Sequence, residues 1–241
     1  MASRILVIGG TGMVGQQLVA ASINAGHPTA VLVRPPACDD PVKAKLVDTL
    51  CNNGASLVYG DINDRESLVS AIKDADVVIS AVGHTSPELE ILKQMYGPPV
   101  TRVTVYGDGK HQAMFVNEKD MCTLAIKAID DPRTLHKILY VRPAVNLCSL
   151  DQLVSLWEKK IGNDLEKCYV AEEELTGKIQ ASPFPLNFQL AMVHWTFLAE
   201  TLEFEQITVS NDASDDDGVE ATVLYPDMKY VTVEEYLDNL K

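Results

Sequence analysis

The sequence predicts an α/β fold with a doubly wound parallel sheet, and two observations predict it. Short apolar runs alternate with stretches of helical spacing from Arg4 to Val82, and glycines or prolines separate many of them. A second, less regular set of strands and helices follows after residue 100. Strands that alternate with helices form a parallel sheet with helices on both faces. We therefore expect such a sheet, followed by a smaller C-terminal α/β region.

The elements of the first part follow one another regularly. Arg4–Ile8 is apolar and β-branched, as a buried strand is, and Met13–Ala25 has helical spacing and ends before Gly26. Further elements are expected at Thr29–Arg34 (strand), Val42–Asn52 (helix), Ser56–Tyr59 (strand), Ser67–Ile72 (helix) and Asp76–Val82 (strand). This order is that of one mononucleotide-binding half with a fourth strand.

The regular alternation stops after Gly83. The stretch 84–99 contains three prolines and has room for a short helix at Glu88–Tyr96 at most. Later elements are expected at Thr101–Tyr106 (strand), Met114–Asn117 (extended), Glu118–Ile129 (helix), Lys137–Arg142 (buried strand), Leu150–Ile161 (helix), Asn187–Ala199 (helix) and from Val231 onward (helix).

Composition excludes some classes of partner. The 241 residues carry a net charge of −14, which argues against binding to nucleic acid or to an anionic membrane surface. Five widely spaced cysteines without a C-x-x-C motif indicate free thiols in a reducing compartment. No apolar run is long enough to span a membrane, and a strand begins too early for a signal peptide. We expect a cytoplasmic protein without a metal site, in which Asp212–Asp217 is a solvated loop.

The sharpest motif is a glycine-rich turn between the first strand and the first helix. Its residues are Gly9, Gly10, Thr11, Gly12, Met13, Val14 and Gly15, which satisfy both G-x-x-G-x-x-G and G-x-G-x-x-G. The first glycine permits a tight turn, Gly12 lets the backbone approach a pyrophosphate, and Gly15 permits close packing of the helix. Amides at the helix N-terminus then hold the anion. Strand, turn and helix together predict a Rossmann-type dinucleotide site, with a tight turn without ligand as the alternative.

The end of the second strand indicates which dinucleotide binds. NAD sites usually have an acid there, whereas this chain has Arg34, and its first acid is Asp39. Arginine is always charged and suits a phosphate, so we expect NADPH, with Lys43 as a second contact. A solvated charge is the alternative for either residue. Ser80, Ala81 and Val82 end the fourth strand at the edge where ligands bind in such sheets, and Asp61-Ile62 follows the third strand at the same edge.

Several stretches resemble the plant isoflavone-reductase-like group within the NmrA-like atypical short-chain dehydrogenases. They run from I-L-V-I-G-G-T-G-M-V-G and A-D-V-V-I-S-A-V-G-H through D-D-P-R-T-L-H-K-I-L-Y-V-R-P to L-Y-P-D-M-K-Y-V-T-V-E-E-Y-L. The C-terminal half is most similar to phenylcoumaran benzylic ether reductases. The resemblance implies an oxidoreductase of plant phenylpropanoid metabolism that uses NADPH on phenolic substrates. It also implies cofactor contacts from Gly9, Gly12, Gly15, Arg34 and Lys43.

One family segment has no counterpart here. Between S-A-V-G-H and V-Y-G-D-G the family has a fifth strand ending in P-S-E-F-G, a helix with the lysine assigned as general acid or base, and a sixth strand. Lys93 is the single lysine in the stretch 84–102 and does not match that motif. We therefore expect a sheet truncated by two central strands and assign no catalytic residue. The expected domains are an incomplete NADP-binding domain at 1–100 and a mixed region at 101–241, which combines returning Rossmann elements with the substrate subdomain.

A bare fourth strand would leave an edge that is prone to aggregation. Either 101–106 or 137–142 pairs with it, or a spliced transcript, a gene-model error or an excised segment explains the join. Three possibilities stay open for the chain: an NADPH-dependent reductase, a non-catalytic NADP(H)-binding protein, or a chain that does not fold alone. A homodimer is possible. The resemblance implies that the region 187–199 helps to form the wall of the substrate pocket, whereas its composition favours packing of most of its apolar side chains in the core. His194 is expected to be buried and hydrogen-bonded rather than catalytic.

Overall fold

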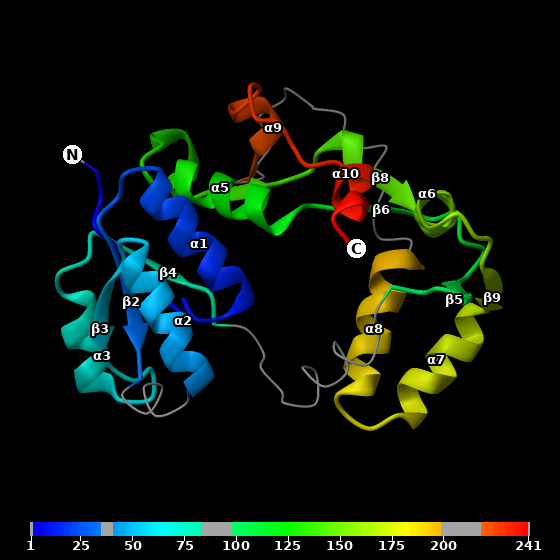
Figure 1. Ribbon diagram of the computed structural model, residues 1–241, viewed down its shortest axis with the longest axis horizontal. Coiled ribbons are helices and arrows are strands. Elements are labelled where there is room, and N and C mark those ends of the chain that lie inside the picture. The colour runs from blue at the N-terminus through cyan, green and yellow to red at the C-terminus, as the bar shows by residue number, and fades with distance from the viewer. Residues whose placement is uncertain (1, 35–40, 83–97, 199–217, 241) are drawn as a thin grey trace. The chain divides into compact units, whose positions relative to one another are not determined.

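The structure, a computed structural model, describes residues 2–34, 41–82, 98–198 and 218–240. The chain divides into two compact units, one made of residues 1–84 and 118–139 and the other of residues 85–117 and 140–241 (Figure 1). The expected helix at 88–96 and the acidic loop at 212–217 lie outside the described residues. The domain boundary expected at residue 100 stays a prediction.

The first unit contains a parallel four-stranded sheet. Its strands are β1 (Ile5–Ile8), β2 (Thr29–Val33), β3 (Ser56–Tyr59) and β4 (Val77–Ser80), in the order β3-β2-β1-β4. In the register of the sheet Val7 lies beside Val31 on one side and Ile79 on the other. The predicted parallel α/β sheet is confirmed, and the strand order reverses between β1 and β4.

Helices cover both faces of this sheet. The side that carries Ile5 and Val7 packs against α1 (Met13–Asn24), α2 (Pro41–Asn52) and α5 (Glu118–Ile129), and the opposite side packs against α3 (Arg65–Ile72). Helix α5 comes from much later in the chain and lies along α1 (Figure 1). There the buried Cys122 thiol lies 3.7 Å from the Val14 carbonyl oxygen, and burial raises the pKa of that thiol.

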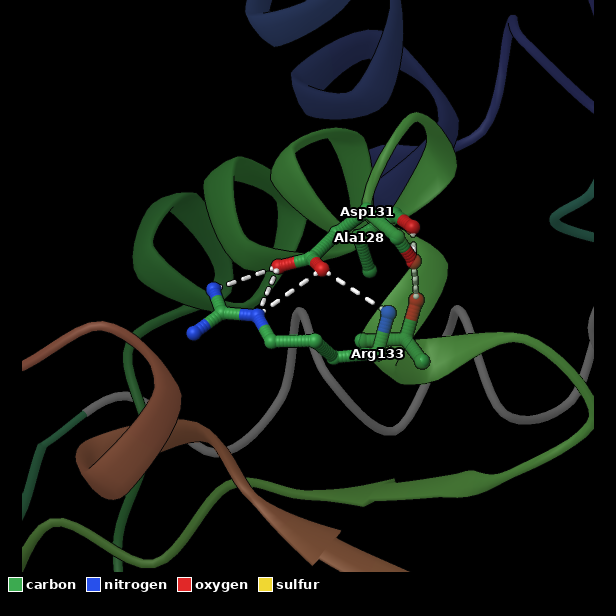
Figure 2. Close-up of polar contacts among 4 residues, drawn as sticks. Ala128, Asp131 and Arg133 are labelled. Atoms are coloured by element: carbon green, nitrogen blue, oxygen red, sulfur yellow. Dashed lines mark hydrogen bonds and ion pairs between the residues drawn. The ribbon is translucent and has the colours of Figure 1, made fainter.

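A short 3-10 turn closes the C-terminal end of α5. Asp131 caps this turn (Pro132–Thr134) by accepting the Arg133 backbone N–H at 3.0 Å, and it pairs with the Arg133 guanidinium (Figure 2). The Thr134 hydroxyl donates to the Ala128 carbonyl at 2.7 Å. The D-D-P-R-T stretch therefore satisfies backbone groups that the helix end would leave without partners.

The second unit combines short paired strands with helices. Strands β5 (Arg102–Tyr106) and β9 (Glu166–Val170) pair in parallel, and β6 (Gln112–Met114) and β8 (Leu147–Ser149) pair antiparallel. Strand β10 (Gly218–Glu220) pairs with β7 (Ile138–Tyr140), of which only Tyr140 belongs to this unit. The helices that the structure describes here are α6 (Leu150–Ile161), α7 (Glu172–Ala181), α8 (Leu186–Phe197), α9 (Ala221–Leu224) and α10 (Val233–Asp238).

Two side chains fix the core of this unit. The Trp157 indole N–H donates to the Pro99 carbonyl at 2.6 Å, and its ring packs with Val105 and Leu165. The buried Asn146 side chain donates to the Val231 carbonyl at 2.8 Å and accepts the Val233 N–H at 3.1 Å. The segment before α10 is therefore anchored by hydrogen bonds to Asn146 as well as by apolar packing.

The structure corrects the expectation that 101–106 or 137–142 pairs with the fourth strand. Neither candidate strand pairs with β4, because β5 pairs with β9 and β7 with β10. The strand expected to be buried at 137–142 is reduced to β7, and Ile138 in it is 57% exposed. Within the described ranges, β4 has a neighbour only in β1.

None of the helices that the structure describes is both long enough and apolar enough to cross a membrane. Cys51, Cys122, Cys148 and Cys168 are free thiols.

The pair of Arg4 and Asp76 predicts a pH dependence of stability. The Arg4 guanidinium and backbone N–H bond to the Asp76 carboxylate and lower its pKa from 3.8 to about 2. A carboxyl group with a depressed folded-state pKa stabilises the fold above its unfolded pKa, and this contribution is lost as the pH falls toward 2. Urea unfolding at several pH values should show Asp76→Asn less stable than wild type above pH 3.8, with the gap closing toward pH 2. A gap that stays constant over this range would contradict the assignment.

Candidate functional site

The glycine-rich turn contains backbone contacts that are too close for residues with a side chain. A Cβ built on Gly15 would lie 2.1 Å from the Gly9 carbonyl oxygen, and one on Gly10 would lie 2.6 Å from the Val31 side chain. Gly9 itself has a φ of +83°, which L side chains rarely adopt. The first helical turn of α1 is therefore pressed against the backbone of the turn that precedes it.

The turn leaves backbone donors at the N-terminus of α1. The Gly12 N–H bonds to the Gly9 carbonyl at 2.9 Å, and the first helical bond runs from the Gln16 N–H to the Gly12 carbonyl at 2.9 Å. As the first N–H groups of a helix, those of Met13, Val14 and Gly15 have no acceptor within it, and no side chain in the described part of the chain caps them. A Cβ on exposed Gly12 would come close only to the Gly9 oxygen, at 3.2 Å. Amides and exposed backbone together make a surface suited to an anion.

The end of β4 lies directly against this turn. The Ala81 N–H donates to the Ile8 carbonyl at 2.8 Å, and a Cβ on Gly9 would meet the Ala81 carbonyl oxygen at 2.8 Å. Ser80 and Val82 are exposed on either side of Ala81. The structure therefore brings Ser80–Val82 together with the glycine-rich turn, at the point where the strand order reverses. Ligands of open α/β sheets bind at this point.

Arg34 follows β2 at the same edge of the sheet. Its side chain is exposed, and the neighbouring Val33 carbonyl accepts the Gly60 N–H at 3.1 Å, which ties the ends of β2 and β3 together. Lys43 lies in the first turn of α2, beyond residues 35–40, which are not described. The structure thus places Arg34 beside the strand that carries the turn, and it places Lys43 on the helix that follows.

The loop after β3 is closed by local hydrogen bonds of Asp61. The Asp61 carboxylate accepts the Asn63 backbone N–H at 2.9 Å, and the Ser67 hydroxyl accepts the Asp61 N–H at 3.0 Å. Tyr59, which ends β3, is 57% exposed at this edge and was not among the predicted site residues. No sequence motif includes Tyr59. Only its position as the last residue of a strand indicates that it lies at the ligand-binding edge of the sheet.

Helix α8, in the second unit, exposes an apolar face. Phe188, Met192 and Trp195 recur at helical spacing on one side of it and are 45%, 47% and 54% exposed. The prediction that these side chains pack in the core is wrong, because α8 has no buried residue. His194 is hydrogen-bonded as expected, to Glu172 at 2.8 Å, but its side chain is 29% exposed rather than buried.

Comparison with known proteins gives a family match over nearly the whole chain. A model of the NmrA-like family matches in two consecutive blocks, residues 1–96 and 96–237. Phenylcoumaran benzylic ether reductase Betv6 of Betula pendula is 39% identical over 98% of this chain and 97% of its own length. Eugenol synthase 2 of Clarkia breweri is also 39% identical, over 98% of each chain. The complex of leucoanthocyanidin reductase from Vitis vinifera with NADPH superposes with a TM-score of 0.82 at 28% identity, over 98% of this chain and 99% of that one.

The alignment with the Betula reductase contains many positions that have no residue in this chain. It extends over 306 positions, whereas this chain has 241 residues, so at least 65 positions have no residue here. The two blocks of the family match meet at residue 96, which follows β4 by a short distance in the chain.

The contacts of Gly15 predict a loss of stability on substitution. Gly15→Ala should lower the free energy of unfolding by about 1–3 kcal/mol, because the new methyl group overlaps the Gly9 carbonyl. The control is Gly177→Ala in α7, where a Cβ has no atom within 4 Å. This control should be neutral or gain up to about 1 kcal/mol, since alanine favours a helix. Equal unfolding free energies for both variants in urea would contradict the close contact.

Proposed function

The chain belongs to the NmrA-like family, and on this basis we propose that it binds NADPH and reduces a phenylpropanoid-derived substrate. The observation that carries the proposal is the glycine-rich turn where the strand order reverses, with Arg34 at the same edge of the sheet.

The residues of the turn fit a dinucleotide. The amides of Met13, Val14 and Gly15 are directed out of the helix N-terminus, where a pyrophosphate is stabilised by hydrogen bonds and the helix dipole. Gly12 has no side chain to keep the phosphate oxygens away from the backbone. Ser80–Val82 lie beside the turn and would border the nicotinamide half.

Arg34 is the proposed reason for a preference for NADPH over NADH. A guanidinium at the end of β2 can bind the 2′-phosphate through two parallel hydrogen bonds. Lys43 on α2 would add a second positive charge. NADPH, when bound, supplies a hydride from C4 of its nicotinamide. The protein positions that carbon and the substrate, which lowers the barrier by orientation.

The substrate class rests on the relatives and on helix α8. The relatives are named for a phenylcoumaran benzylic ether, for eugenol and for leucoanthocyanidin, all of which carry phenolic rings. Phe188, Met192 and Trp195 offer aromatic and thioether surface that suits such rings. We propose that this face of α8 contacts the substrate.

A second function has its own support. The gap of at least 65 positions and the break of the family match at residue 96 favour loss of the strand–helix–strand segment that carries the family's lysine. Without that proton donor, the chain would bind NADPH without reducing a family substrate. An assay of the 241-residue chain with NADPH and a phenylcoumaran or pinoresinol separates the two functions.

Several finer expectations stay proposals. Free thiols in the described part of the chain support a reducing compartment such as the cytoplasm. Plant origin rests on the plant relatives. For the homodimer, the exposed edge of β4 is the candidate contact.

The role of Arg34 predicts a cofactor-specific effect. NADPH should raise the melting temperature of the wild type more than NADH, because a ligand that binds the folded state stabilises it. Arg34→Ala should weaken NADPH binding roughly 10- to 100-fold by removing charged hydrogen bonds, and should leave NADH binding unchanged. Lys73→Ala, which removes a positive charge at the far end of α3, is the control. Equal loss for both cofactors would contradict the 2′-phosphate contact.

The face of α8 predicts an effect on the substrate alone. If the chain oxidises NADPH with a phenolic substrate, Trp195→Ala should lower kcat/KM roughly 5- to 10-fold through loss of ring contacts. The affinity for NADPH should not change. Tyr236→Ala, which removes an exposed ring from α10, should have no effect. If wild type binds NADPH but neither substrate causes its oxidation, the non-catalytic function is the correct one.

A further inference from the structure

One edge of β4 has no partner among the residues that the structure describes. β4 pairs with β1 through the Val77 N–H, which donates to the Arg4 carbonyl at 3.1 Å, and the Ala81 N–H, which donates to the Ile8 carbonyl. Backbone groups of alternate strand residues point to opposite sides of the strand. The N–H and C=O groups of Val78 and Ser80 therefore point away from β1, toward the free edge.

The edge lacks the charged residues and prolines that commonly prevent strands from pairing. Val77–Ser80 contains no lysine, no proline and no charged residue. One face beside it is also uncovered, since Val78 is 43% and Val82 51% exposed. Helix α3 packs on the same face, but over Leu6 and Leu32. Parallel strands are usually covered on both faces, so this exposure is unusual.

The break between the two blocks of the family match lies shortly after this strand. The family match breaks at residue 96, and at least 65 positions of the Betula relative have no residue here. Both findings fit a chain that is shorter after β4 than in the relatives. An exposed edge with unpaired backbone groups is a template for another strand.

We propose that a second copy of this chain pairs with β4 antiparallel, about a two-fold axis that passes beside Ile79. In this register Val78 exchanges two backbone hydrogen bonds with Ser80 of the second copy. By symmetry, Ser80 exchanges two more with Val78 of the second copy. Ile79 faces its own counterpart, and Asp76 lies opposite Val82, so no like charges meet. A register centred on Val78 would form fewer hydrogen bonds between the copies. It places Asp76 opposite Ser80, and the Asp76 N–H already donates to the Arg4 carbonyl at 2.9 Å.

A disulfide test reports this register directly. Opposed residues of a non-hydrogen-bonded antiparallel pair have Cα atoms about 4.5 Å apart, within the range of about 4.4–6.8 Å that a disulfide spans. Ile79→Cys, with Cys38, Cys51 and Cys168 changed to serine, should give a covalent dimer on mild oxidation. Val77→Cys in the same background should not, because its two copies lie about 13 Å apart along the strands.

Sedimentation tests the unmodified edge independently of any cofactor. The wild-type chain should sediment as a dimer, and Val78→Lys should sediment as a monomer, because the lysine places a charge on the pairing edge. Val69→Lys, on α3 and 54% exposed in the wild type, should remain a dimer. A monomeric wild type, or equal cross-linking of Ile79→Cys and Val77→Cys, would overturn the proposal. Neither result bears on the proposed roles of the glycine-rich turn and Arg34, which cofactor binding tests separately.

Discussion

The first unit depends on direct contact between the backbone of α1 and that of the turn before it. Gly15 lies so close to the Gly9 carbonyl that even a methyl group would overlap it. This contact directs the free amides of α1 toward the carboxyl edge of the sheet. It also places α1 where α5 can pack on it, with Cys122 next to the Val14 carbonyl. The geometry of the candidate anion site and the packing of the helix layer therefore have one origin.

The two faces of the sheet are covered unequally. Three helices cover the side of Val7, whereas the short helix α3 alone covers the other side among the described residues. The uncovered area lies at β4, the last strand before the break between the two blocks of the family match. The exposure of this face does not disturb the glycine-rich turn, because the turn is held by contacts with β1, β2, α1 and the end of β4. The end of β4 therefore takes part both in the candidate cofactor site and in the exposed edge of the sheet.

Much of the fold follows from local patterns in the sequence. Ser56–Tyr59, Glu118–Ile129 and Leu150–Ile161 have the predicted bounds, because apolar spacing and capping residues act within a few positions. Pairing between strands that are far apart in the sequence could not be predicted from it. β9 was missed because charged residues begin Glu166–Val170, and the partners of β5 and β7 could not be inferred from spacing. At the site, the glycine spacing predicts the turn because larger residues would not fit there. The residues of α8, in contrast, have the same apolar spacing whether the helix is exposed or buried, so its exposure could not be predicted.

The return of α5 to the first unit has a consequence for biosynthesis. Cys122 and Ile126 are 1% and 3% exposed, and both belong to the core that α1 and the sheet form. A nascent chain that has left the ribosome only as far as residue 84 lacks this helix. Completion of the first core must wait until residues 85–117, which belong to the other unit, have been translated. During that interval the apolar side of α1 is open to solvent, and a chaperone that binds apolar surface would act at this stage.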